Sequence, residues 1–274
     1  MAKILITGSS SGMGLASAQL FASKGWEVIA VIRNPEQARH LEALGIKVKY
    51  CEQTQYAKIE QLFQDPDLQN FDAAFLNAGY GHMATVEDTT PQALEAQLAC
   101  NTVGTWAYFN ACIKVFRQQG HGRILVNSSV ISFSPIPYRA AYGASKAALD
   151  QMVETFRIEN RDPNIQASLL HPGPVATNFR QRALHEYQTQ TKNQDTVYAQ
   201  DYAQQEQRLQ NKNRKRFTAQ PEQAAALAYK CLTSKKQKIH YFLCLPTYVV
   251  WYAKKILPAS WFEFFIRHAH KLEK

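Results

Sequence analysis

The sequence predicts a single α/β domain built on a parallel sheet that helices cover on both faces. Over the first 173 residues, apolar β-branched segments alternate with amphipathic ones, which is typical of repeated strand–helix–strand units. The length of 274 residues suits one large domain or two small ones, and the absence of a polar linker in this stretch favours one. All twelve glycines lie at or before Gly173, so we expect residues 174–274 to be mostly helical.

The predicted elements follow one another with short turns. Strands are expected at 3–7, 26–32, 46–50, 73–76, 123–127 and 165–171. Helices are expected at 14–24, 35–44 and 91–118, the first two ended by a glycine. The polar segment 175–217 predicts a substrate loop with short helices, and 246–274 predicts a helical C-terminal tail on a core of residues 1–180.

Composition excludes several classes of protein. Hydrophobic residues make up 46% and charged residues 19%, which is typical of a globular chain rather than a disordered one. Five scattered cysteines without a C-x-x-C pair predict buried thiols in a reducing compartment and no bound metal. The first apolar run ends too early for a signal peptide, and the uncharged stretch 239–253 is too short to span a bilayer. We therefore expect a cytoplasmic protein.

A glycine- and serine-rich turn runs from Thr7 to Gly14, between the first strand and the first helix. Gly8 can adopt a positive φ, Gly12 lets a phosphate approach the backbone, and Gly14 lets the helix pack on the sheet. The helix N-terminus then faces the pyrophosphate of a dinucleotide. The turn predicts a cofactor site that also includes Ser10, Ser11 and Met13.

Four motifs, in this order along the chain, resemble those of the classical short-chain dehydrogenase/reductase family. They are the G-x-x-x-G-x-G spacing at 8–14, Asn77-Ala78-Gly79, Tyr142-x-x-x-Lys146, and Pro172-Gly173. The resemblance covers about residues 3–177, and 221–244 more weakly. It implies a Rossmann-type doubly wound sheet, a nicotinamide cofactor held partly by those motifs, and homo-oligomers built on the long helices.

Tyr142 and Lys146 lie four residues apart, so a helix places them on one face about one turn apart. A phenol with a pKa of about 10 exchanges protons poorly at neutral pH, but a nearby ammonium and a cationic nicotinamide ring favour the phenolate. Lowering that pKa to about 7 requires roughly 4 kcal/mol of preferential interaction with the anion. We therefore expect Tyr142 to protonate a carbonyl oxygen or to deprotonate an alcohol.

The resemblance implies two further catalytic residues. Ser129, thirteen residues before Tyr142, would hydrogen-bond the substrate oxygen, with Ser128 as the rival candidate. Asn101 would hold a water that links Lys146 to solvent, whereas a helix kink or a solvated side chain is the alternative for a mid-helix asparagine. The complete set argues against a non-catalytic NADP-binding redox sensor or scaffold, because a sensor needs no proton relay.

The end of the second strand predicts NADP(H) rather than NAD(H). NAD enzymes usually place an acid there to accept from the ribose 2′-OH, whereas this chain has Ile32 followed by Arg33. A guanidinium can bind a 2′-phosphate through charge-assisted hydrogen bonds. The alternative is that Arg33 is a solvated surface charge, and Ser11 stands where many NADP-dependent members carry a basic residue.

Further cofactor contacts are implied by the resemblance. Glu52 occupies the position that usually bonds the adenine amine. The stretch expected to wrap the nicotinamide carboxamide consists of Pro172, Gly173, Val175 and Thr177.

The loops after the strand ends are expected to form a mostly apolar substrate pocket, which predicts a retinoid, steroid or fatty substrate. Its candidate residues are Tyr80, His82, Ile131, Phe133, Ile136, Tyr138 and Phe179. His171 ends a buried strand and is expected to be structural.

The end of the chain is both aromatic and basic. From Lys235 to Lys274 there are eight Lys or Arg and two Asp or Glu, so +6 of the total +9 lies there. The tail could pack on the substrate loop, lie in a membrane interface as a basic amphipathic helix, or form a subunit contact. The net charge and the basic run 212–216 also make nucleic-acid binding an alternative function. Such a run is usually a solvated loop, however, and no platform of aromatic residues for base stacking accompanies it.

Overall fold

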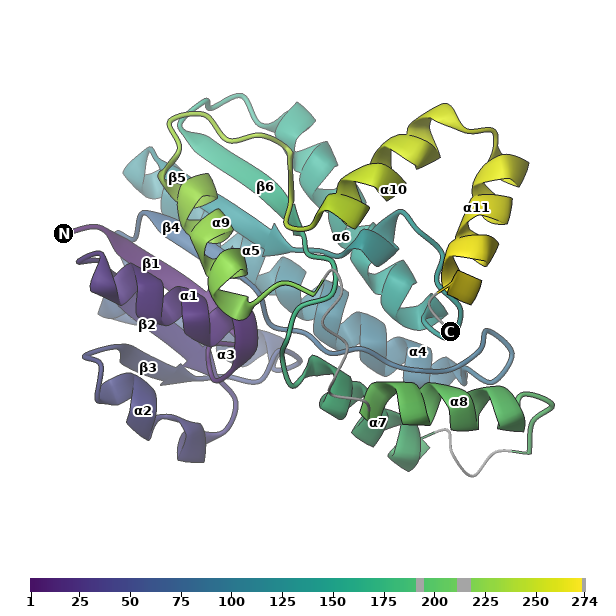
Figure 1. Cartoon of the computed structure of the whole chain (residues 1–274). Helices are drawn as coiled ribbons and strands as arrows, with labels where there is room; N and C mark the ends of the chain where they lie inside the picture. The colour runs from purple at the N-terminus through teal and green to yellow at the C-terminus, as the bar shows by residue number, and fades with distance from the viewer. Residues whose placement is uncertain (191–194, 211–217, 273–274) are drawn as a thin grey trace.

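In a computed structural model, the chain forms a seven-stranded parallel sheet with helices on both faces (Figure 1). The structure describes residues 1–190, 195–210 and 218–272. The strands are β1 (Lys3–Thr7), β2 (Glu27–Ile32), β3 (Lys47–Tyr50), β4 (Ala73–Leu76), β5 (Gly122–Asn127), β6 (Ile165–His171) and β7 (His240–Phe242). Their order, β3-β2-β1-β4-β5-β6-β7, reverses direction between β1 and β4, which confirms the doubly wound topology.

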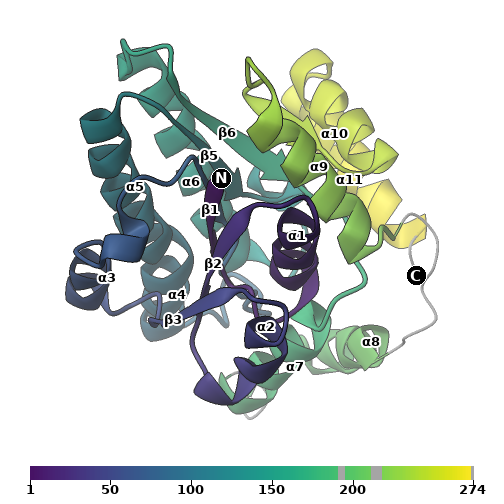
Figure 2. The same cartoon turned by 90° about the vertical axis from the view of Figure 1, so that its left-hand side faces the viewer.

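The two faces of the sheet are covered by different helices (Figure 2). One face packs against α1 (Gly12–Ser23), α2 (Arg39–Glu42) and α9 (Pro221–Thr233). The other packs against α3 (Tyr56–Leu62), α5 (Thr105–Gln119) and α6 (Ala140–Glu159). Successive strand residues alternate between the two cores: Ile4 lies in the first and Leu5 in the second, and both are fully buried.

The long helix expected at 91–118 is interrupted. It consists of α4 (Pro91–Leu98), a π-helical segment (Ala99–Gly104) and α5. The helix expected at 35–44 is likewise broken into a 3₁₀ turn (Pro35–Gln37) and α2. Further 3₁₀ turns span Pro66–Leu68 and Val130–Ser132.

The substrate-loop region contains α7 (Phe179–Gln190) and α8 (Ala199–Gln210). These helices pack through Tyr187 and Tyr202, whose ring centroids are 5.2 Å apart. The basic run 212–216 lies outside the described residues.

The chain ends in α10 (Leu245–Ile256) and α11 (Ala259–Leu272), which lie at one end of the sheet (Figure 1). Trp251 of α10 packs on Phe133 with centroids 4.9 Å apart, so the tail is joined to the core. The five cysteines are buried and form no disulfide. In the described part of the chain, no helix combines the length and the apolarity needed to cross a membrane.

Candidate active site

A cavity of about 860 Å³ lies at the carboxyl ends of β1, β4 and β5, where the strand order reverses. All of the predicted cofactor residues line it except Gly14, and so do three of the four catalytic candidates, Ser129, Tyr142 and Lys146. Gly14 and the fourth catalytic candidate, Asn101, do not line the cavity but lie next to Gly8 and Gly79, which do. Residues from distant parts of the sequence therefore meet in one cavity.

The glycine turn has the geometry expected of a phosphate-binding turn. Gly8 and Gly12 have φ values of 68° and 55°, a region that favours glycine. A Cβ atom on Gly14 would lie 2.2 Å from the Gly8 carbonyl oxygen, so this position must stay small. Ser11 caps α1 without a side-chain hydrogen bond, and the first turn carries no acid. The helix start can therefore donate N–H groups to a pyrophosphate, and the donor set fits a dinucleotide.

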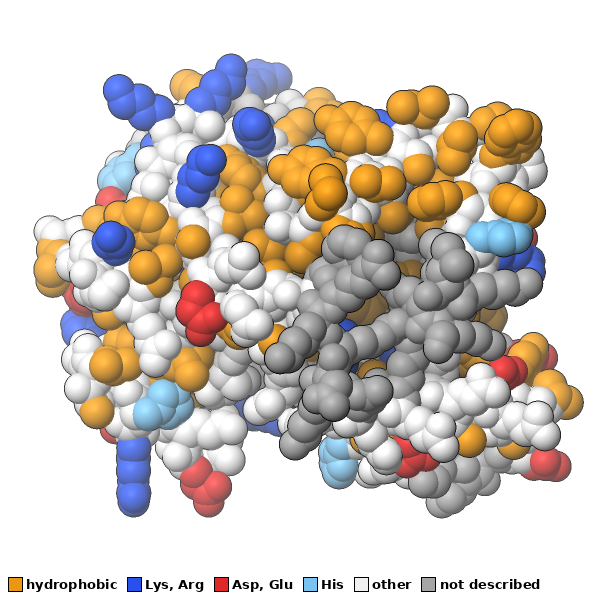
Figure 3. Space-filling model, viewed as in Figure 1, with side chains coloured by type: hydrophobic (Ala, Val, Ile, Leu, Met, Phe, Trp, Pro, Cys, Tyr) orange, Lys and Arg blue, Asp and Glu red, His pale blue; other side chains and the backbone are white. Residues whose placement is uncertain are grey.

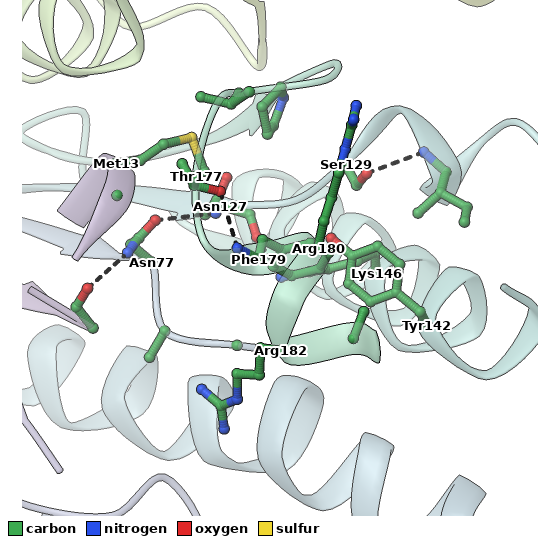
Figure 4. Close-up of a pocket in the computed structure, with 18 of the residues that line it drawn as sticks. Met13, Asn77, Asn127, Ser129, Tyr142, Lys146, Thr177, Phe179, Arg180 and Arg182 are labelled. Carbon is green, nitrogen blue, oxygen red and sulfur yellow. Dashed lines mark hydrogen bonds between the residues drawn. The ribbon is translucent and has the colours of Figure 1, made fainter. Parts of the chain in front are cut away.

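The Asn77-Ala78-Gly79 motif joins the end of β4 to this turn. The Thr7 hydroxyl accepts from the backbone N–H groups of Asn77 and Ala78 at 3.0 and 3.1 Å. The Asn77 amide donates to the carbonyl of Gly8 and accepts from Asn127 Nδ2 at 3.1 Å (Figure 4). The floor of the cavity is thus held by hydrogen bonds between β1, β4 and β5.

Ser129, and not its rival Ser128, faces the cavity. The Ser128 hydroxyl donates to the buried Asp150 carboxylate. Ser129 Oγ accepts from the Ile131 N–H at 3.3 Å (Figure 4), and the Ser129 hydroxyl is near enough to the Tyr142 phenol to act on its pKa. Two hydroxyls therefore lie together where a carbonyl or alcohol oxygen can bind between them.

Lys146 is held beneath Tyr142. Its Nζ lies 5.9 Å from the centroid of the Tyr142 ring and donates to the Asn127 carbonyl at 2.7 Å. The lysine is 2% exposed, and burial lowers its pKa to about 8. Its ammonium is thus fixed in a site that excludes most water.

The groups of the protein do not acidify Tyr142 by themselves. Burial raises its pKa to about 12, while the nearby Ser129 hydroxyl and the charge of Arg139 act in the opposite direction. We expected Lys146 and a cationic nicotinamide ring to lower this pKa to about 7. Burial outweighs these two effects in the protein alone, and the lowering of the pKa by Lys146 together with a bound nicotinamide ring stays a prediction.

Asn101 lies in the π-helical segment and is fully buried. Its Oδ1 accepts from the Tyr80 N–H at 3.0 Å, and its Nδ2 donates to the Tyr80 carbonyl at 2.8 Å and to Ser145 Oγ at 3.1 Å. A Cβ atom on Gly79 would lie 3.0 Å from Asn101 Oδ1 and 3.6 Å from Lys146 Nζ, so both side chains flank this glycine. Asn101 therefore holds the chain after Gly79 in place, and the helix departs from regular α-geometry here.

At the far end of the cavity, β2 ends in the buried Ile32 and the exposed Arg33. The Arg33 guanidinium lies 3.6 Å from the Glu52 carboxylate, and 58% of the arginine side chain is exposed. Exposed ion pairs of this kind contribute little energy. Arg33 can therefore turn toward a phosphate without losing a strong interaction.

Near Tyr142 the cavity is lined by apolar side chains together with Arg139, Arg180 and Arg182, and only part of the expected set lies there. Ile131, Ile136 and Phe179 line it, together with Val250 and Ile266 from the tail. The Phe179 ring lies 5.5 Å from that of Tyr142, between centroids. The start of α7 therefore covers the catalytic candidates.

Four expected pocket residues lie elsewhere, because each packs on a neighbouring element. Tyr80 is covered by Arg182, whose guanidinium carbon lies 5.3 Å from the ring. His82 is buried away from the cavity, Phe133 packs on Trp251, and Tyr138 packs on Tyr202 at 5.7 Å. Phe133 and Tyr138 thus anchor the tail and α8.

A buried polar chain behind the cavity was not expected. Asp150 lies one turn after Lys146 on α6, and burial raises its pKa to about 7. His171 Nδ1 lies 3.9 Å from Asp150 and 3.2 Å from the Ser129 carbonyl, and its Nε2 contacts His240 Nδ1 at 3.1 Å. The structural role expected for His171 fits these contacts. The i, i+4 spacing that pairs Tyr142 with Lys146 also reaches Asp150 and is the signal that could have found it.

The family model and the related proteins that match this chain point to the same family. The family model for short chain dehydrogenases matches residues 2–188. The uncharacterized oxidoreductase YbbO of Escherichia coli K12 is 30% identical over 261 residues, which is 93% of this chain and 90% of that protein. The 3-ketodihydrosphingosine reductase of Bacteroides thetaiotaomicron is 30% identical over 177 residues, 64% of this chain and 65% of that protein.

Solved structures agree on the fold. A short-chain dehydrogenase from Streptomyces avermitilis superposes with a TM-score of 0.77 at 24% identity, over 91% of this chain and 90% of that one. One from Burkholderia phymatum, in complex with NAD, has a TM-score of 0.76 at 20% identity, covering 93% and 92% of the two chains. One from Sphingobium yanoikuyae, in complex with NADPH, has a TM-score of 0.72 at 22% identity, covering 92% and 91%. The chain is an oxidoreductase that belongs to the classical short-chain dehydrogenase/reductase family.

Proposed function

We propose that this protein is an NADP(H)-dependent oxidoreductase that interconverts a hydrophobic alcohol and its ketone or aldehyde by hydride transfer. The observation that carries the proposal is the grouping of Ser129, Tyr142 and Lys146 in the same cavity as the glycine turn. A nicotinamide cofactor, when bound, supplies or accepts the hydride.

The side chains have separate roles in this proposal. The hydroxyls of Ser129 and Tyr142 bind the substrate oxygen, and Tyr142 donates its proton to that oxygen during reduction. Lys146 keeps a positive charge close to the phenol, and its bond to the Asn127 carbonyl fixes its position. Asn101 positions the chain at Gly79 against Lys146.

The preference for NADP(H) rests on the charge at the end of β2. No carboxylate occupies position 32 to accept from a ribose 2′-OH, and Arg33 lines the cavity there. Glu52 contacts Arg33 at this end of the site, and its bond to the adenine amine stays a prediction.

The apolar lining supports a lipophilic substrate. Ile131, Ile136, Phe179 and Val250 line the cavity, in which Arg139, Arg180 and Arg182 are the charged neighbours. One relative bears the name of a reductase of 3-ketodihydrosphingosine, a lipid ketone. A steroid, retinoid or fatty ketone suits these walls. Assembly into a homo-oligomer and a cytoplasmic location stay predictions.

The direct test is NADPH oxidation measured over a panel of long-chain aldehydes, ketosteroids and quinones. We expect turnover on at least one lipophilic carbonyl and a loss of about a hundredfold or more in Tyr142→Phe. NADPH fluorescence titration serves as the control, because Tyr142→Phe should still bind the nucleotide. Binding of NADPH without turnover on any compound would favour the redox sensor instead.

A further inference from the structure

The two C-terminal helices expose a continuous apolar surface. On α10 the exposed apolar residues are Leu245, Tyr248, Val249, Tyr252 and Ile256, which recur at the spacing of a single helix face. Ile256 is 75% exposed. Trp261 and Phe264 extend the exposed apolar surface onto α11. Together these seven residues form what we call the outer stripe, and Figure 3 shows apolar side chains gathered over this part of the molecule.

The opposite faces of the same helices line the cavity. Pro246, Thr247 and Val250 of α10, and Ile266 of α11, contribute to its wall. The two short helices therefore separate the proposed substrate site from whatever covers the outer stripe. A 12-residue helix is only about 18 Å long, so α10 is suited to lie along a surface rather than to cross a bilayer.

Basic residues accompany the outer stripe. Lys254 and Lys255 end α10, and Lys235, Lys236 and Lys238 are exposed just before β7, which α10 contacts. The Lys255 ammonium lies 4.4 Å from the Trp251 ring centroid, so its stem runs along apolar surface while its charge reaches water. The charges therefore favour a partner with negative charge.

The acidic residue in the described part of α10 and α11, Glu263, does not cancel the positive charge of the lysines. Glu263 bonds Arg267 at 2.7 Å within α11. Two copies of the chain meeting through this surface by a twofold axis would bring lysine-rich patches together, which is unfavourable. Exposed Tyr and Trp beside lysines are typical of surfaces at the boundary between lipid headgroups and acyl chains.

We propose that α10 and α11 dock the protein on an anionic lipid bilayer through the outer stripe, with the cavity on the other side of these helices. Membrane docking does not depend on the proposed function. Its consequence, that a lipophilic substrate reaches the cavity from the membrane, does rest on the proposed function. Binding itself requires no turnover, so the two can fail separately.

The test is co-sedimentation of the full chain, without cofactor or substrate, with phosphatidylcholine vesicles and with vesicles containing one third phosphatidylglycerol. We expect binding to the anionic vesicles that persists in part at high salt. The double variant Tyr252→Ser/Ile256→Ser should bind at least about tenfold more weakly, because apolar burial is lost. Lys254→Gln/Lys255→Gln should weaken binding to the anionic vesicles only.

Val86→Ser is the matched control, since Val86 is an exposed apolar residue far along the chain from the tail. It should bind like the unmodified protein. If the double variant melts at a lower temperature, Leu245→Ser alone must weaken binding in the same direction. The proposal is overturned by absence of binding to the anionic vesicles, or by equal binding of the stripe variants. It is also overturned if the protein forms a dimer in solution and the double variant Tyr252→Ser/Ile256→Ser is a monomer, because a second copy of the chain then covers the outer stripe.

Discussion

At the residue scale, one face of α6 carries three titratable groups in successive turns, the half-buried Tyr142 and the buried Lys146 and Asp150. Burial moves each of them toward its neutral form: the pKa of Tyr142 rises to about 12, that of Lys146 falls to about 8, and that of Asp150 rises to about 7. A cationic nicotinamide ring, when bound, would add a positive charge beside these groups and favour their deprotonated forms.

Asp150 gives a pH-dependent prediction. Its pKa is raised from the ordinary aspartate value of 3.8 to about 7 in the folded protein, so folding favours the protonated acid and this contribution is lost as pH rises between those values. Asp150→Asn should therefore gain stability relative to the unmodified protein by up to about 4 kcal/mol between about pH 4 and about pH 8. Urea unfolding at both pH values measures this. If the free energies of unfolding of the two proteins differ by the same amount at both pH values, the raised pKa of Asp150 is contradicted.

Arg33 gives a prediction on cofactor choice. A charge-assisted hydrogen bond contributes about 1.5–3 kcal/mol, so Arg33→Gln should lower the ratio of kcat/KM for NADPH to that for NADH by roughly ten- to a hundredfold. Arg39→Gln, an exposed arginine on α2, is the matched control and should leave the ratio unchanged. An unchanged ratio in Arg33→Gln would show that Arg33 is only a solvated charge.

At the scale of elements, the strands were the most predictable part of the fold. All six expected strands lie within a residue of their expected bounds, and the apolar runs of β2 (five residues) and β4 (four residues) reflect burial on both faces of the sheet. β7 was missed because its three residues are too few to show a pattern. At Asn101 the sequence offered a helix kink only as an alternative, because the hydrogen bonds that Asn101 makes with Tyr80 in the π-helical segment are tertiary.

These bonds lead to a prediction about the π-helical segment. Asn101→Ala leaves the buried N–H and carbonyl of Tyr80 without their partner, which should lower the free energy of unfolding by about 1–3 kcal/mol. It should also lower kcat, since the chain at Gly79 loses its support. Asn110→Ala, at an exposed position on α5, provides the comparison in thermal melts and in activity assays. Equal melting temperatures for the two variants would contradict the proposed role of Asn101.

At the scale of the whole molecule, the reversal of strand order places the ends of β1, β4 and β5 around one cavity. The motifs of the core could be placed there from the sequence because strand ends in a doubly wound sheet share one edge. The substrate side could not, because residues from α7 and the tail reach it by long-range packing. That packing moved Phe133 and Tyr138 out of the expected pocket and brought in Val250 and Ile266.

The central claim is that Tyr142 faces the ring that carries the hydride. A crystal structure of the protein with NADP⁺ and a lipophilic ketone tests it most directly. We expect the pyrophosphate at the start of α1, the nicotinamide ring beside Tyr142, and the ketone oxygen hydrogen-bonded to the hydroxyls of both Ser129 and Tyr142. A nucleotide bound with its nicotinamide away from Tyr142, or a Tyr142 hydroxyl directed into solvent, would contradict the account.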